Sequence, residues 1–187
     1  MEGFRLSQGI EQKMTGKFES LVGSPLTTIS YDEVPEDVKK YFESQSSKFI
    51  LPEEYHTQNF QKLYTFSYLN GDICYIAEQD KTYGTNGDTE RLTYFMDRRG
   101  DKEIGYLELR LNISNQIIYF KGKPFVGFTR TAEDFQGKGL GERRLRVANA
   151  YSLEQYNVPL NSSAVIEEEA KRIWERLVEK DEAEKYI

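Results

Sequence analysis

The segment 137–141 contains three glycines and separates a strand-like run from a helix-like run. Residues 124–131 before it are rich in aromatic and β-branched side chains, which is typical of a strand. Over residues 145–155, apolar side chains recur at helical spacing, which predicts an amphipathic helix. Glycine lets the backbone turn tightly because no Cβ stands in the way. The order of strand, glycine turn and helix constrains the fold more than any other feature.

The rest of the chain divides into strands first and helices later. Apart from a helix over 35–45, the part before the glycines has strand-like runs at 63–69, 73–77, 91–96, 104–111 and 115–120, with Asn70-Gly71 as a hairpin turn. The polar segment 79–90 reads as a surface loop, and 158–161 as a short strand. A final apolar stripe at helical spacing over 166–177 predicts a second helix after the glycines.

These elements predict an α/β or α+β fold with a mixed, mostly antiparallel sheet flanked by helices. We expect residues 1–60 to form an N-terminal extension with at least one helix, and residues 61–187 to form the main domain. A chain of 187 residues is long enough to bury a sizeable core.

Composition excludes several classes of function. The net charge of -6 disfavours a broad nucleic-acid surface, since phosphate binding needs clustered lysine and arginine. One cysteine, Cys74, and one histidine exclude an intrachain disulfide and supply too few ligands for a typical zinc site. No apolar run is long enough to span a membrane. We therefore expect a soluble, cytoplasmic protein without a metal ion.

The glycine segment has the properties of an anion-binding loop. Backbone amides at a helix start point the same way and carry part of the helix dipole, so they bind phosphate. Lys138, Arg143 and Arg144 add positive charge, although the two arginines could equally lie on a solvated helix face. A pyrophosphate is the natural ligand. The ATPase P-loop pattern is broken by Gly141-Glu142-Arg143, and the glycine spacing also misses the dinucleotide fingerprint.

Residues 136–141 (QGKGLG) follow the pattern Gln/Arg-x-x-Gly-x-Gly/Ala, and here the chain resembles the GNAT superfamily of acetyl-CoA-dependent N-acyltransferases. The resemblance covers residues 124–178. It implies that the loop amides bind the pyrophosphate of coenzyme A and that the preceding strand pairs with the pantetheine arm. The cofactor residues it implies are Thr129, Arg130, Thr131, Gln136, Gly137, Lys138, Gly139, Leu140, Gly141 and Asn161.

The chain departs from this family at three places. Members often carry a tyrosine in the last helix that protonates the leaving thiolate, where this chain has Trp174. A frequent carboxylate base near the start of the motif strand would fall at Phe125. The ten residues after 177 leave no room for the usual pair of closing strands.

Two residues are candidates for catalysis. Glu108 is the candidate general base because strand alternation places it on the opposite face from Leu107 and Leu109, although it could also be an ordinary solvated residue. Ser163 could orient the thiol or polarise the carbonyl, or it could simply cap the last helix. Asn161 shares the first of these roles.

The sequence therefore predicts an acyl-CoA-dependent N-acyltransferase in which an amine attacks the thioester directly. The acceptor amine could belong to a protein or a small molecule; a nucleic acid and a membrane are disfavoured. The alternative is a non-catalytic binding or inhibitory protein on the same fold, which retains the coenzyme A site.

Overall fold

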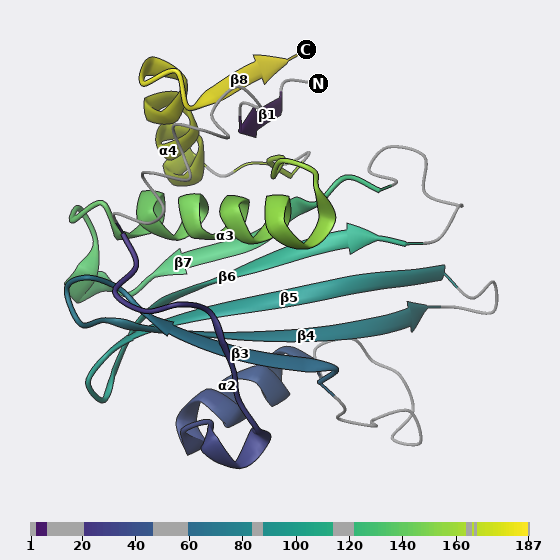
Figure 1. Ribbon diagram of the computed structural model, residues 1–187. Coiled ribbons are helices and arrows are strands. Elements are labelled where there is room, and N and C mark those ends of the chain that lie inside the picture. Colours follow the sequence, from purple (N-terminus) through teal and green to yellow (C-terminus); the bar gives the residue numbers. More distant parts are fainter. Residues whose placement is uncertain are drawn as a thin grey trace.

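A computed structural model describes residues 3–6, 21–46, 60–83, 88–113, 122–163, 166 and 168–186. Within these ranges the chain has an α+β fold with three α-helices, a six-stranded antiparallel sheet and a two-stranded sheet (Figure 1). The predicted fold class is confirmed. No α-helix in the described ranges is long and apolar enough to cross a membrane.

The large sheet is mainly a meander of consecutive strands. Its order is β2-β3-β4-β5-β6-β7, and each neighbouring pair is antiparallel. The strands are β2 (Thr27–Thr28), β3 (Lys62–Ser67), β4 (Ile73–Tyr83), β5 (Asp88–Arg99), β6 (Lys102–Asn112) and β7 (Phe125–Thr131). A 3-10 turn at Tyr31–Glu33 follows β2.

The β3–β4 hairpin was predicted correctly, whereas the β4–β5 hairpin was predicted as a loop. The β3–β4 turn contains Gly71 with φ of +83°, a conformation that glycine adopts without strain, and this hairpin is confirmed. The predicted loop over 79–90 is wrong at both ends, because β4 continues to Tyr83 and β5 begins at Asp88. Polar side chains there pair across the ladder, as Asp80 does with Arg91 at 2.7 Å, so their polarity is compatible with strand pairing and does not indicate a loop.

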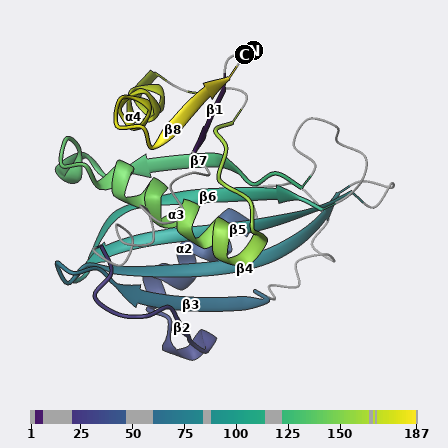
Figure 2. The same ribbon diagram turned by 45° about the horizontal axis from the view of Figure 1, so that its top comes forward.

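Helices cover both faces of the sheet (Figure 2). Helix α3 (Leu140–Tyr156) packs on one face and α2 (Glu36–Ser46) on the other. Alternation divides the strand residues between two cores, because successive side chains point to opposite faces. Phe95, Leu107 and Leu109 join the α3 core, while Leu92, Tyr94 and Met96 join the α2 core.

The chain ends form a second, smaller layer beside β7. Strand β1 (Gly3–Leu6) pairs antiparallel with β8 (Ala183–Tyr186), which follows α4 (Glu168–Glu179), so the two ends of the chain lie together in both views. Among the described residues a single strand follows the last helix, in place of the pair usual in the family, and its partner in the ladder is β1.

The predicted short strand at 158–161 is reduced to isolated bridges. Asn161 pairs with Phe125 in parallel and with Arg5 in antiparallel orientation, and no longer ladder forms. These bridges join β7 to β1, so the large and small sheets meet near the start of β7 and separate beyond it. Pro159 cannot donate a backbone hydrogen bond, which limits pairing in this segment. The strand predicted at 115–120 lies outside the described residues.

Candidate functional site: a cavity at the glycine loop

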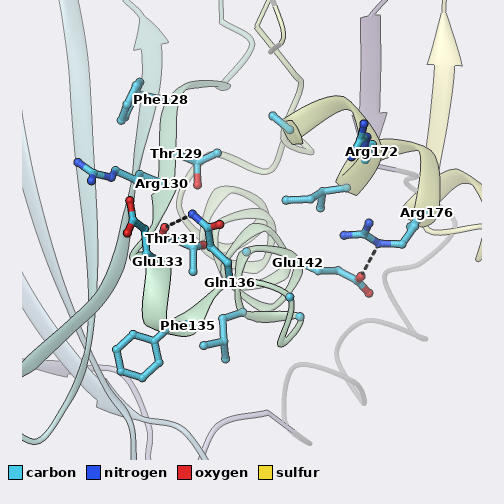
Figure 3. A pocket seen from close by; sticks show the side chains of 16 residues that line it. Phe128, Thr129, Arg130, Thr131, Glu133, Phe135, Gln136, Glu142, Arg172 and Arg176 are labelled. Carbon is cyan, nitrogen blue, oxygen red and sulfur yellow. Dashed lines mark hydrogen bonds and ion pairs between the residues drawn. The ribbon is translucent and has the colours of Figure 1, made fainter. Parts of the chain in front are cut away.

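A cavity of about 890 Å³ lies between the outer edge of β7, the start of α3 and one side of α4 (Figure 3). Eight of the ten cofactor residues implied by the sequence line it. They are Thr129, Arg130, Thr131, Gln136, Gly137, Gly139, Leu140 and Gly141. The structure thus brings together the end of the motif strand and the glycine loop around one space.

The three glycines of the loop are required for two different structural reasons. Gly137 and Gly139 have φ of +72° and +73°, and a Cβ built on either would meet nothing within 4 Å. Their backbone is therefore open, and their conformation is one that other residues adopt only with strain. A Cβ on Gly141 would lie 3.0 Å from Cδ1 of Ile173, so this glycine allows α4 to approach α3 closely.

The start of α3 provides hydrogen-bond donors at the cavity wall. The helix begins at Leu140, and its N-cap, Gly139, has no side chain with which to cap the first turn. Arg143 N donates to Gly139 O at 3.0 Å, which is the first helical bond. The preceding amides, of Leu140 to Glu142, have no carbonyl to bond within the helix. They carry the positive end of the helix dipole and are suited to bind an anion.

Gln136 and Lys138, the two side chains beside the glycines, make different contacts. Gln136 Nε2 donates to Thr131 O at 3.2 Å and so ties the loop back to the end of β7. Lys138 Nζ donates to Asp134 O at 2.8 Å and lies 5.5 Å from the centre of the Phe135 ring. Lys138 is not among the described residues that line the cavity, so the structure does not bring this predicted ligand to it.

The outer edge of β7 forms the opposite wall. Near its start, Val126 N donates to Asn161 O at 2.9 Å, and beyond this bond the two segments diverge. Ala132 N donates to Ile104 O across the β6 side at 2.9 Å. Because backbone direction alternates along a strand, the amides of Thr129 and Thr131 point to the other edge, toward the cavity. An extended ligand could therefore bond to this edge as an added strand does.

Two further predicted residues, Asn161 and Ser163, lie outside the cavity lining. Asn161 is buried, and its Nδ2 donates to Pro124 O at 3.1 Å and to Pro159 O at 3.2 Å. Its side chain thus holds the junction at which β7 leaves its neighbour. Ser163 is partly buried, and neither residue is among the described lining residues.

The candidate base Glu108 lies on the face that its alternation predicts. Leu107 and Leu109 are in the α3 core, while Glu108 stands opposite Tyr94 and Phe128 on the other face. It is 8% exposed and accepts a hydrogen bond from Arg110 Nε, so it is not the solvated residue of the alternative interpretation. Its register partner Phe128 lines the cavity, which places Glu108 one side chain away from the rim.

Between Glu108 and Leu109 the register shifts, and Gly127 is the extra residue of a β-bulge. A Cβ on Gly127 would lie 2.6 Å from Glu108 Oε1, so the carboxylate rests directly against the bulged backbone. The bulge also reverses the alternation, because Val126 faces the α3 core whereas Phe128, two residues later, faces the other side with its register partner Glu108. Phe128 and Thr129 both line the cavity.

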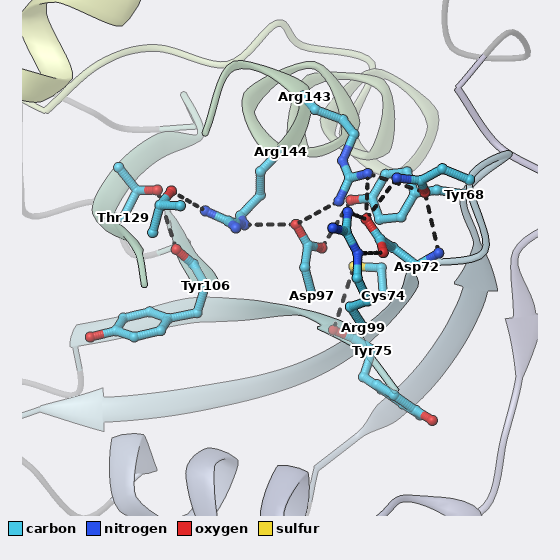
Figure 4. Close-up of polar contacts among 12 residues, drawn as sticks. Tyr68, Asp72, Cys74, Tyr75, Asp97, Arg99, Tyr106, Thr129, Arg143 and Arg144 are labelled. Carbon is cyan, nitrogen blue, oxygen red and sulfur yellow. Dashed lines mark hydrogen bonds and ion pairs between the residues drawn. The ribbon is translucent and has the colours of Figure 1, made fainter. Parts of the chain in front are cut away.

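The prediction that Arg143 and Arg144 supply charge to a phosphate is wrong (Figure 4). Both side chains are nearly or fully buried in ion pairs. Arg144 Nε lies 3.0 Å from Asp97 Oδ2, and Arg143 Nη1 lies 2.8 Å from Asp72 Oδ2. The Arg143 guanidinium also covers the Tyr68 ring at 3.7 Å from its centre. Their charge is neutralised by carboxylates from β5 and the β3–β4 turn.

The arginines of this network lower the pKa of the Asp72 carboxyl. Burial alone would raise its pKa, but hydrogen bonds from Arg99, Arg143 and Asn70 lower the pKa to about 2. Cys74 belongs to the same buried region, and burial raises the pKa of its thiol well above the ordinary value. This cysteine is a core residue, not a reactive thiolate.

The network also braces the cavity wall. Arg144 Nη1 donates to Arg130 O at 3.0 Å and to Thr131 Oγ1 at 3.4 Å. Room for this guanidinium comes from Gly105, where a Cβ would lie 2.6 Å from Arg144 Nη2 and 2.2 Å from Arg130 O. Arg144 is thus a positioning residue that holds β7 against α3.

Helix α4 contributes cationic side chains to the cavity lining that are not among the residues predicted from the sequence. Arg172 and Arg176 both line the cavity, on the side opposite the glycine loop. Their spacing of four residues places them on one helix face, and this spacing is the signal that could have identified them. Ile173 lies between them in the sequence and lines the cavity as well, whereas Trp174 is buried and stacks on Phe4 at 6.0 Å.

Comparison with protein-family models, curated proteins and solved structures found no match. Among the described residues, no group of three or more histidine, cysteine, aspartate or glutamate side chains is placed to hold a metal ion.

Proposed function

We propose that this chain is an acyl-CoA-dependent N-acyltransferase that transfers an acetyl group to an amine. The observation that carries the proposal is the single cavity shared by the glycine loop, the free edge of β7 and the arginines of α4. The resemblance at residues 136–141 gives the same expectation independently of the cavity.

The residues present fit coenzyme A in three ways. The first-turn amides of α3, next to the open backbone of Gly137 and Gly139, suit a diphosphate. The outward amides of Thr129 and Thr131 suit an extended amide chain such as pantetheine. Arg172 and Arg176 supply the cations that a multiply charged ligand requires, in place of Lys138, Arg143 and Arg144.

Acetyl-CoA would supply the thioester that is attacked. An acceptor that arrives as an ammonium ion must first lose one proton to become nucleophilic. Its nitrogen would then form the new C–N bond as the C–S bond breaks, and the second nitrogen proton would pass to solvent while the thiolate takes one from solvent. We assign removal of the first proton to Glu108, directly or through a water molecule. The acceptor then approaches across Phe128, which lines the cavity and whose side of β7 is the one Glu108 occupies. Catalysis rests mainly on orientation, because direct transfer needs no activated nucleophile from the protein.

A non-catalytic protein that retains the coenzyme A site is the second candidate. Two observations favour it. Among the described lining residues none is a tyrosine that could protonate a thiolate, and Trp174, in the place of the family's acid, is in the core. In addition, Glu108 is already engaged by Arg110.

Steady-state release of free thiol from acetyl-CoA, measured with a panel of primary amines, separates the two candidates. The transferase predicts amine-dependent thiol release that is lost in Glu108→Gln and kept in Glu103→Gln, an exposed carboxylate on the same strand. Binding of coenzyme A without thiol release for any amine would support the binding protein instead.

A further inference from the structure

A carboxylate lines the cavity in the first turn of α3, the same turn whose backbone amides suit an anion. Glu142 is in the first turn of α3, lines the cavity and has only 9% of its side chain exposed. Its Oε1 accepts hydrogen bonds from Arg146 and Lys180, and its Oε2 lies 3.6 Å from Arg176 Nε. Arg146 is also paired with Glu182 at 2.7 Å. We call these five residues the Glu142 cluster.

The charges of the Glu142 cluster do not cancel. Three cations face two carboxylates, so one positive charge is left over. Arg176 is the cation that Glu142 holds most loosely, because its contact exceeds hydrogen-bond distance and its side chain is 48% exposed. Lys180 is equally exposed, but only Arg176 and Glu142 of the cluster line the cavity. The surplus positive charge therefore faces the ligand space.

The Glu142 carboxylate is stabilised by the same helix dipole that would stabilise a ligand anion. A negative group in the first turn of a helix is stabilised by the same dipole that would bind a phosphate. Burial raises the pKa of Glu142, but Lys180 and Arg146 together lower it below its ordinary value, so the carboxylate stays charged at neutral pH. An anion entering the cavity thus meets both the repulsion of Glu142 and a guanidinium that Glu142 holds only weakly.

We infer that Arg176 moves from Glu142 to a phosphate of the bound ligand, and that Glu142 acts as an internal competitor for this arginine. The cavity thereby favours ligands with several phosphate charges, which can displace the carboxylate, over ligands with a single negative charge. This inference rests on the proposed function only in that a phosphorylated ligand occupies the cavity. Glu142 and Arg176 would be specificity-determining residues for that ligand.

The test is calorimetric titration of the parent chain and its variants with coenzyme A and, separately, with inorganic pyrophosphate. Glu142→Gln should bind both probes about tenfold more tightly, since a repulsive charge is removed and Arg176 is released. The matched control is Glu182→Gln, which removes the other carboxylate of the cluster. Glu182 pairs with the same Arg146 but does not line the cavity, so its variant should bind within about twofold of the parent.

A double-variant cycle with Arg176→Met distinguishes exchange from simple repulsion. If Glu142 competes for Arg176, the loss of affinity caused by Arg176→Met must be larger in the Glu142→Gln background than in the parent. Equal losses in both backgrounds would overturn the exchange. A smaller loss would overturn it as well, because Glu142 would then be holding Arg176 in position for the ligand.

The two probes separate this inference from the proposed function. Binding of pyrophosphate without binding of coenzyme A would contradict the proposed function, while the cycle would still test the exchange. Failure of the parent and of Glu142→Gln to bind either probe would overturn both. Melting temperatures of all variants verify that each chain is folded at the temperature of titration.

Discussion

Replacing Arg144 by methionine should destabilise the fold strongly, because it leaves a buried carboxylate without its main partner. Arg144 and Asp97 are both 0% exposed, and their ion pair measures 3.0 Å. After the replacement, Asp97 keeps the hydroxyl of Tyr68 at 2.9 Å, but its nearest remaining guanidinium is that of Arg143 at 3.8 Å. Removing one partner of a buried pair typically costs about 3–5 kcal/mol. The bond to Arg130 O is lost as well.

Urea unfolding followed by circular dichroism measures this loss. The matched control is Arg99→Met, since Arg99 pairs with Asp72 in the same network but has 49% of its side chain exposed. We expect the control to lose much less stability than Arg144→Met, because solvent screens the charge of the exposed Arg99 side chain. The double variant Asp97→Asn, Arg144→Met should recover about half of the loss, because no unpaired charge remains. A loss below about 1 kcal/mol for Arg144→Met would refute the buried pair and restore Arg144 as a possible phosphate ligand.

Three further predictions follow from the site and the network. Gly139→Val should abolish coenzyme A binding, because Gly139 has φ of +73° and its open side faces the cavity; Gly100→Val, equally strained at φ of +56° in a hairpin turn, should bind normally, and equal titration curves for the two would contradict the cradle. The lowered pKa of Asp72 stabilises the fold above its ordinary pKa of 3.8, and this stability is lost as the pH falls toward 2; Asp72→Asn should therefore show a flatter dependence of unfolding free energy on pH in that window, and an unchanged slope would exclude the ion pair. Glu108→Gln should reduce turnover by about 10²–10⁴-fold with coenzyme A affinity unchanged, and less at high pH where the amine arrives deprotonated; an unchanged pH–rate profile would assign the proton to solvent or another group.

The glycine loop could be predicted from sequence because its physics is local. A strand, a turn that needs positive φ at Gly137 and Gly139, and a helix start are all encoded within about twenty residues. Which edge Thr129 and Thr131 face does not follow from the strand alone, because the bulge at Gly127 in the pairing with β6 reverses the alternation that holds at Val126. The alternation of Glu108 with its neighbours is equally local, and it was predicted correctly.

The burial and ion pairing of Arg143 and Arg144 depend on long-range contacts, which a local sequence pattern does not predict. Arg143 and Arg144 pair with Asp72 and Asp97, which lie 71 and 47 positions earlier in the chain. Arginines near the start of a helix are typical of a solvated or ligand-binding face. Only the packing of α3 against the sheet shows that these two are buried in ion pairs. The same reason explains the missed role of Arg176, since its relation to Glu142 requires α4 to fold back beside α3.

The strand that closes the small sheet was also beyond local reasoning. Residues 3–6 form β1 because they pair with β8, which is near the opposite end of the chain. Neither segment is long enough to indicate a strand by itself, and the long-range pairing supplies the backbone partners that fix both.

Titration of the parent chain with coenzyme A, followed by calorimetry and by the melting temperature, shows whether the cavity is a coenzyme A site. We expect saturable binding at one site and a melting temperature that rises with ligand concentration, because the ligand binds only the folded chain. It also predicts that Gly139→Val loses both signals while Gly100→Val keeps them. No heat of binding and an unchanged melting temperature at millimolar coenzyme A would contradict the claim that this cavity is a coenzyme A site.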